Sequence, residues 1–235
     1  MSTPDGFFAT TRWTMVRQAG MSVENALEAL CSSYWYPLYA YVRRHGFSKE
    51  DAEDLTQAFF AMLLERRDFT ALKQENGRFR AFLLAALKNY LANERDRAGR
   101  KKRGSHITHF SLDLQSADST FQIADATTIA PDAAYDREWA VALLGRVISR
   151  LQEEAVADSK AERFEHLKAY LTVGRSEIRY AEAAVSLGMD EGAVRVAVHR
   201  LRKRYRELLK DEVAQTLSDP AMVEEELAVL LGAFA

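Results

Sequence analysis

Residues 190–210, "DEGAVRVAVHRLRKRYRELLK", carry two different faces at helical spacing. At about 100° per residue, one arc is apolar and consists of Val194, Val198, Leu201, Tyr205 and Leu208. The opposite arc is basic and consists of Arg195, His199, Arg200, Lys203 and Arg206. Val196 lies in the middle of those cations. A helix that only has to stay solvated would carry Lys or Glu there, so Val196 indicates contact with a surface that offers methyl groups as well as charge.

A glycine and an acid before this stretch mark a turn between two helices. An apolar helix predicted over residues 178–187 stops at Gly188, a residue suited to a left-handed C-cap, and Asp190 is a favourable N-cap. This spacing is typical of a helix-turn-helix motif, whose second helix enters the major groove of DNA. The predicted DNA contacts of that helix are Gly192, Ala193, Arg195, Val196, His199, Arg200 and Lys203.

Length and composition describe an ordinary soluble protein. The chain has 235 residues, 48% of them hydrophobic and 28% charged, with a net charge of −2. No apolar run approaches the ~20 residues that cross a bilayer, and the first residues lack the pattern of a signal peptide. The single cysteine, Cys31, excludes an internal disulfide framework. We therefore expect a cytoplasmic protein without membrane insertion.

The small net charge hides a strong segregation of charge along the chain. Residues 78–104 hold nine Lys or Arg against two acids, whereas residues 111–138 hold six acids against one Arg. After Lys210 there are six acids and no Lys or Arg. Basic blocks separated by an acidic one predict two anion-binding surfaces.

The first basic block forms part of a predicted helix, "GRFRAFLLAALKNYLANERDRAGRKKRG", that mixes cations with aromatic and amide side chains. This mixture suits stacking on unpaired bases while cations hold the phosphates. The candidate contacts are Arg78, Arg80, Lys88, Asn89, Asn93 and Arg97. The alternative is a helix with core aromatics and a solvated basic face, and we expect Phe82, Leu83 and Leu87 to be core in either case.

Helical periodicity over most of the chain, with no convincing strand, predicts an all-α fold. Residues 1–109 and 135–211 are expected to form two helical domains joined by an acidic linker, residues 110–134. The second is the helix-turn-helix domain. In the first, Ser48 caps a helix expected to bury Ala52, Leu55, Phe59 and Leu63. Residues 212–235 are expected to form an acidic amphipathic tail that either packs on the second domain or sits over its basic face as an inhibitor.

Three segments together resemble a bacterial RNA polymerase sigma factor of the extracytoplasmic-function type. They are "YWYPLYAYVRRHGFSKEDAEDLTQAFFAMLLER", "GRFRAFLLAALKNYLANE" and "YAEAAVSLGMDEGAVRVAVHRLRKRYRELL", in that order. The resemblance implies that Asp51, Asp54 and Gln57 dock on the β′ clamp of core polymerase. It also implies that residues 78–97 melt the minus-ten promoter element, that the helix from Asp190 reads the minus-thirty-five element, and that the acidic linker lies in the RNA exit path.

Other classes of protein stay open on the residues alone. A helix-turn-helix regulator that binds DNA without polymerase explains the last third of the chain but not the first basic block. The other class is an adaptor whose basic helices are merely solvated. No catalytic residue, cofactor or metal is expected, because the histidines show only the weak pair His106 and His109 and no Gly-rich phosphate loop is present. Promoter DNA and core polymerase are the expected partners; control by an anti-sigma protein, by a kinase acting on the linker or by the tail stays open.

Overall fold

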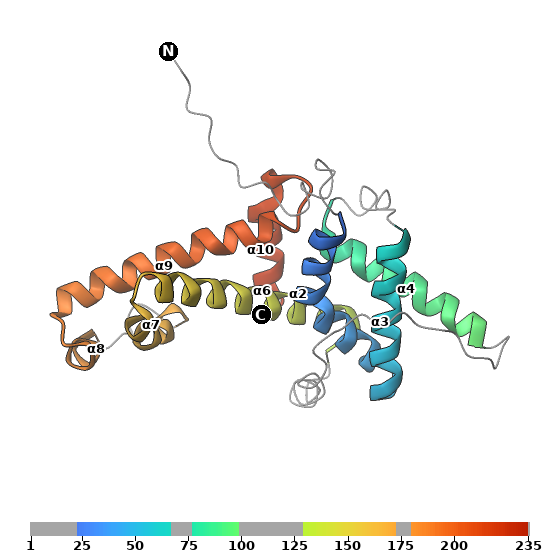
Figure 1. The fold of residues 1–235 in the computed structure, drawn as a ribbon, viewed down its shortest axis with the longest axis horizontal. Helices are drawn as coiled ribbons and strands as arrows, with labels where there is room; N and C mark the ends of the chain where they lie inside the picture. The colour runs from blue at the N-terminus through green and yellow to red at the C-terminus, as the bar shows by residue number, and fades with distance from the viewer. Residues whose placement is uncertain (1–22, 67–76, 99–128, 173–179, 235) are drawn as a thin grey trace, which may run out of the picture. The chain divides into compact units, whose positions relative to one another are not determined.

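The computed structural model describes residues 23–66, 77–98, 129–172 and 180–234, and every regular element within them is helical (Figure 1). The helices are α2 (Val23–Arg44), α3 (Lys49–Arg66), α4 (Phe79–Ala98), α6 (Pro131–Ala157), α7 (Ala161–Lys168), α8 (Tyr180–Leu187), α9 (Glu191–Ala214) and α10 (Val223–Gly232). Short 3₁₀ turns cover Ala169–Leu171 and Pro220–Met222. The predicted all-α fold is confirmed for this part of the chain. None of these helices combines the length and the apolar character that a membrane span requires.

The chain divides into two compact units. One consists of Met1–Ala142 together with Val213–Ala235, and the other of Leu143–Glu212. The divisions fall inside α6 and α9, so each of these helices contributes to both units. Most of the predicted linker lies outside the described residues, but its last part is the first turn of α6. That helix begins with Pro131 rather than near Tyr135, since proline is well suited to the first position of a helix.

The amino-terminal unit has an aromatic core centred on Trp139, whose side chain is fully buried. Tyr34 stacks on it with ring centroids 4.0 Å apart and planes 8° from parallel, and Phe79 approaches to 6.2 Å. Tyr34 interrupts α2 with a non-helical backbone (φ −127°, ψ 15°). The interruption follows from Pro37, which lacks an N–H and whose ring clashes with the carbonyl group one turn earlier.

Helix α3 starts as predicted but is rotated slightly from the predicted phase. The Asp51 N–H donates to Ser48 Oγ over 3.0 Å, which confirms the cap. The buried residues are Ala52, Thr56, Phe59, Phe60 and Leu63. Leu55, which we expected in the core, is only half-buried. At about 100° per residue the buried stripe is centred between Thr56 and Phe59, and Leu55 lies at its edge.

The acidic tail packs in the amino-terminal unit, whereas we expected it on the other domain. Leu217, Leu227 and Leu230 are buried there. Residues 216–218 run antiparallel to residues 77–79: the Phe79 N–H donates to the Thr216 carbonyl (2.9 Å) and the Ser218 N–H to the Gly77 carbonyl (2.8 Å). The sequence predicted an amphipathic tail correctly, but amphipathicity does not specify the partner.

Gly77 is required at this contact for two reasons. Its φ is +71°, in the left-handed region that other residues rarely adopt, and a Cβ atom there would lie 1.7 Å from Ser218 Oγ. The tail and the start of α4 can therefore approach this closely only because residue 77 has no side chain.

The carboxyl-terminal unit packs α7 and α8 against α9. The buried cluster contains Leu167, Ala183, Val194, Ala197 and Val198. The predicted apolar stripe of α9 is confirmed, with Val194, Val198 and Leu208 buried and Leu201 and Tyr205 half-buried.

Candidate nucleic-acid interface

The turn between α8 and α9 has the geometry that its sequence predicts. Gly188 has a φ of +60°. The Met189 N–H donates to the Ala184 carbonyl over 3.0 Å, and Asp190 Oδ1 accepts a 2.9 Å hydrogen bond from the Ala193 N–H. The end of α8 and the start of α9 are therefore both capped, which sets the direction in which α9 leaves the turn.

The first turns of α9 expose most of the residues predicted to contact DNA. Gly192, Arg195, Val196, His199, Arg200 and Lys203 are exposed, and Ala193 is half-buried. The Val196 side chain, 48% exposed, stands among the cations as the sequence predicted. This face can offer hydrogen bonds to bases or phosphates and one aliphatic contact within three helical turns.

Arg195 is held in place by its own unit. Its guanidinium lies 2.5 Å from Glu191 one turn earlier and 4.4 Å from the centre of the Tyr180 ring in α8. The Arg195 side chain is 59% exposed, so it is oriented by these contacts while it stays accessible. Lys203 lies 4.0 Å from Glu207, at the limit of an ion pair.

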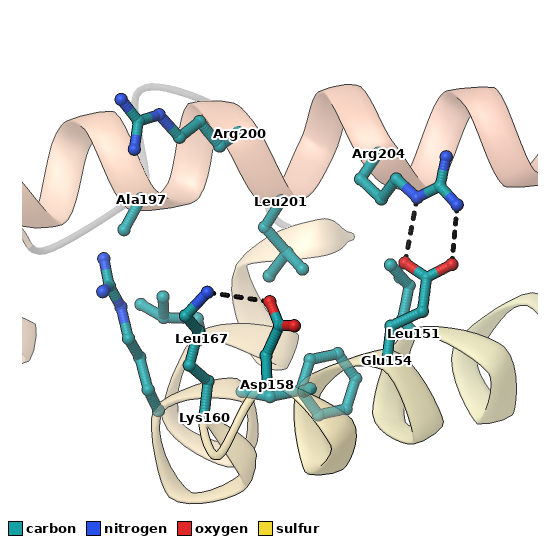
Figure 2. A pocket seen from close by; sticks show the side chains of 12 residues that line it. Leu151, Glu154, Asp158, Lys160, Leu167, Ala197, Arg200, Leu201 and Arg204 are labelled. Atoms are coloured by element: carbon teal, nitrogen blue, oxygen red, sulfur yellow. Dashed lines mark hydrogen bonds and ion pairs between the residues drawn. The ribbon is translucent and has the colours of Figure 1, made fainter.

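Two other cations of α9 serve the internal structure of the unit. Arg202 donates twice to the Tyr170 carbonyl, over 2.9 and 2.6 Å. Arg204 forms a bidentate pair with Glu154 of α6, over 2.9 and 2.6 Å (Figure 2). The hydrogen bond from Arg204 holds the pKa of Glu154 below its ordinary value. The basic character of α9 is thus divided between a structural side and an exposed side.

A pocket of about 310 Å³ lies beside that structural side of α9 (Figure 2). Its apolar lining is Leu151, Ala155, Phe164, Leu167, Ala197 and Leu201. Its polar lining is Glu154, Asp158, Lys160, Arg163, Arg200 and Arg204. Both acids of the lining are paired, Glu154 with Arg204 and Asp158 with Lys160. The other two charged residues of the lining are the cations Arg163 and Arg200, so the pocket is an apolar groove with a net positive rim.

At the start of α4, two predicted DNA contacts are paired with acids. Arg80 is 8% exposed; its Nε donates to Glu226 Oε1 over 3.0 Å and its Nη1 donates to Asp136. Arg78 lies 2.5 Å from Glu225 and 3.2 Å from the second carboxylate oxygen of Glu226. Burial alone would lower the pKa of Arg80, but Glu226 and Asp136 raise it above its ordinary value.

Further along α4, Lys88 donates to Asp132 over 2.7 Å and lies 5.9 Å from the Tyr41 ring. Burial, followed by the charge of Asp132, raises the pKa of Tyr41 to about 12. Asn89 and Asn93 are exposed, whereas the Arg97 side chain lies outside the described part. The solvent-facing section of α4 therefore begins near Lys88 and not at Arg78.

The acids that pair with Arg78 and Arg80 are functional candidates that the sequence analysis missed. In the sequence, Glu225, Glu226 and Asp136 stand out only as members of two acidic stretches. The available signal was the position of Glu226, which shares the helical face of the buried Leu230 and is itself 1% exposed. An acid on the apolar face of an amphipathic helix predicts a cationic partner.

The predicted polymerase-docking residues lie on α3. Asp51 and Asp54 are exposed, and Gln57 is half-buried. Their spacing of three residues brings them onto one face of the helix. This arrangement provides a small acidic surface beside the buried stripe of α3.

Among the described residues, no group of three or more His, Cys, Asp or Glu side chains is arranged to hold a metal ion. The pair His106 and His109 lies outside them. Comparison with protein-family models, with curated proteins and with solved structures finds no match for this chain. The candidate interface therefore has to be interpreted from its own geometry and chemistry.

Proposed function

We propose that this chain is a promoter-recognition subunit of bacterial RNA polymerase, similar to sigma factors of the extracytoplasmic-function type and without catalytic chemistry of its own. The observation that carries the proposal is the capped α8–α9 pair, which presents Val196 among exposed cations. The major groove offers thymine methyl groups next to phosphates, which is the combination that this face of α9 matches.

In this proposal α9 reads the minus-thirty-five element. Gly192 is exposed and has no side chain, so the backbone of α9 can come close to the major groove at this position. Arg195 is pre-oriented by Tyr180 and Glu191, so less side-chain entropy is lost when it binds. His199 and Arg200 follow on the same exposed face, and Lys203 is positioned for a phosphate.

The amino-terminal unit supplies the two other activities of such a subunit. Asp51, Asp54 and Gln57 of α3 form the docking face for the β′ clamp of core polymerase. The exposed section of α4, with Lys88, Asn89 and Asn93, holds the separated strand of the minus-ten element. Amide groups there can hydrogen-bond a flipped base, which offsets part of its unstacking free energy. Core polymerase and promoter DNA are then the partners, in the cytoplasm.

Core association is the first experiment. The purified chain is mixed with bacterial core polymerase, the complex is isolated by size exclusion, and transcription is tested on a random promoter library. A stable complex that starts RNA at a selected two-part motif is the expected result. DNA binding by the chain alone, with no core complex, would instead identify an autonomous helix-turn-helix regulator.

Two matched variants locate the docking face. Asp54→Ala removes an exposed carboxylate from α3 and is expected to weaken core binding. Glu153→Ala removes an exposed carboxylate from α6 and serves as the control for the change in net charge. Equal core affinity of the two variants would exclude Asp54 from the docking face.

A further inference from the structure

The acidic tail covers the cationic start of α4 with carboxylates. Three acids, Glu224, Glu225 and Glu226, occupy the first turn of α10. Glu225 pairs with Arg78, and Glu226 lies between Arg78 and Arg80. Each pair joins a guanidinium to a carboxylate, the same charge-assisted chemistry with which arginine binds a phosphate.

The tail reaches this position through a main-chain contact followed by a separate helix. Residues 216–218 are hydrogen-bonded to residues 77–79. A 3₁₀ turn comes next, capped by Asp219, whose Oδ1 accepts from the Ala221 N–H over 2.9 Å. Helix α10 begins only after this turn. The main-chain contact and the carboxylates are therefore on different segments of the tail.

Charge pairing is a poor way to attach a helix permanently. Glu226 is 1% exposed, and removing a carboxylate from water offsets much of the attraction to its arginines. Apolar residues of similar volume would hold α10 at least as well, as Leu227 and Leu230 do on the same helix. A helix held only by leucines would not require arginines opposite it. The carboxylates of α10 do require them, and they therefore keep two arginines at the start of α4.

We propose that α10 is an internal competitor for nucleic acid: Glu225 and Glu226 occupy Arg78 and Arg80 until single-stranded DNA displaces the helix. This inference rests on the proposed function, since it concerns the same helix, α4. Phosphates replace the two carboxylates of α10, while Arg80 also keeps its pair with Asp136 of α6. Leu227 and Leu230 become exposed when the helix leaves, which makes the covered state the resting one.

The competition is tested with the full chain and a fluorescein-labelled single-stranded DNA 20-mer of mixed sequence, using fluorescence anisotropy. Glu225→Gln and Glu226→Gln remove one carboxylate each without changing side-chain size. Asp211→Asn removes an exposed acid in α9 and controls for net charge. We expect each glutamine variant to bind roughly threefold or more tighter than the control, with a salt slope steeper by about 0.7 per arginine released.

The covered glutamate carries a risk of misfolding, so circular dichroism is recorded for every variant. Glu225 is 66% exposed, and its glutamine variant is expected to fold even where Glu226→Gln does not. Folded glutamine variants that gain no more affinity than Asp211→Asn would overturn the proposal. The absence of DNA binding by every variant would overturn it as well.

Hydrogen exchange provides a second measurement on the unmodified chain. Amides of α10 should exchange faster in the DNA complex than in the free protein, while those of residues 216–218 keep their protection. Unchanged protection of α10 in the complex would contradict displacement.

The two proposals fail in different ways. A chain that binds core polymerase and starts RNA, but whose glutamine variants gain nothing, loses only the internal competitor. A chain whose glutamine variants gain affinity for DNA, but which forms no core complex, loses only the polymerase function.

Discussion

Helices α4 and α9 are both rich in cations, but they use them differently. In α9 the acids that pair with Arg195 and Lys203 are one turn away on the same helix, and both cations stay exposed. At the start of α4 the acids that pair with Arg78 and Arg80 come from α6 and α10, and Arg80 is buried. The difference teaches that a basic stretch of sequence is an available basic surface only where its neighbours in space leave it so.

The largest loss of stability should come from removing Arg80 from the buried charge cluster at the start of α4. Arg80→Met breaks the pairs with Glu226 and Asp136, and it leaves the buried Glu226 carboxylate with Arg78 as its cationic partner. We expect a loss of about 3–5 kcal/mol in the free energy of unfolding, measured with urea.

Two controls separate this loss from a simple change of side chain. The double variant Arg80→Met with Glu226→Leu should recover most of the stability, because both charges are removed together. Arg200→Met, on the exposed face of α9, should change stability by only about 0.5 kcal/mol or less. Equal losses for Arg80→Met and Arg200→Met would contradict the contrast between the two helices.

The two units can also be compared at their left-handed glycines. Gly188→Ala should cost only the strained backbone, about 1–2 kcal/mol, since no atom lies within 4 Å of the added Cβ. Gly77→Ala should cost more, because the same strain is joined by a collision with Ser218. Thermal unfolding of both variants measures the difference in stability. Adding Ser218→Gly to Gly77→Ala should remove the extra loss, because the colliding side chain is gone. A Gly77→Ala variant no less stable than Gly188→Ala would be inconsistent with the close contact.

On the exposed face of α9, Arg200→Ala should weaken recognition of one upstream base pair by about 1–3 kcal/mol while core binding is unchanged. Promoter variants at each position of the minus-thirty-five element, assayed with the core complex, locate the affected base pair. A uniform loss on every promoter sequence would indicate a phosphate contact instead.

The smallest effect concerns the pair of Arg204 with Glu154. In the carboxyl-terminal unit this ion pair corresponds to the pair of Arg80 with Glu226 in the amino-terminal unit. The folded-state pKa of Glu154 lies below the ordinary value of 4.5, so its contribution is present above that pH and is lost as the pH falls through the folded-state pKa. Because the Glu154 and Arg204 side chains are 39% and 42% exposed, we expect less than about 1 kcal/mol. Glu154→Gln should therefore lower Tm slightly at neutral pH, and this difference should shrink as the pH falls through the folded-state pKa of Glu154. A difference that does not change with pH would argue against the ion pair.

What the sequence predicts well is local. Gly188 and Asp190 mark the α8–α9 turn because each acts through its own backbone or through an amide three residues away. The stripe of α9 follows from the same 3.6-residue period. In α3 the helical period is predicted correctly, but the centre of the buried face is not. The sequence pattern favours Leu55 as a core residue because Thr56 is polar, whereas the structure buries Thr56.

What the sequence does not predict is pairing at a distance. Arg80 and Glu226 are separated by 146 positions, and neither residue type indicates the other. Arg80 therefore looked like a DNA contact by composition, since arginine beside aromatics is common both in nucleic-acid sites and around buried acids. The division inside α6 and α9 was hidden for a similar reason, because helical periodicity continues unchanged across it.

The separation between Arg80 and Glu226 also has a consequence in time. At about 5–20 residues per second, a ribosome needs roughly 7–30 s to extend the chain from one to the other. During that interval α4 has been made and its carboxylate partners on α10 have not. A nascent chain is therefore expected to pass through a stage of greater attraction to nucleic acid than the finished protein, and the amino-terminal unit reaches its final charge only after residues 213–230 have emerged.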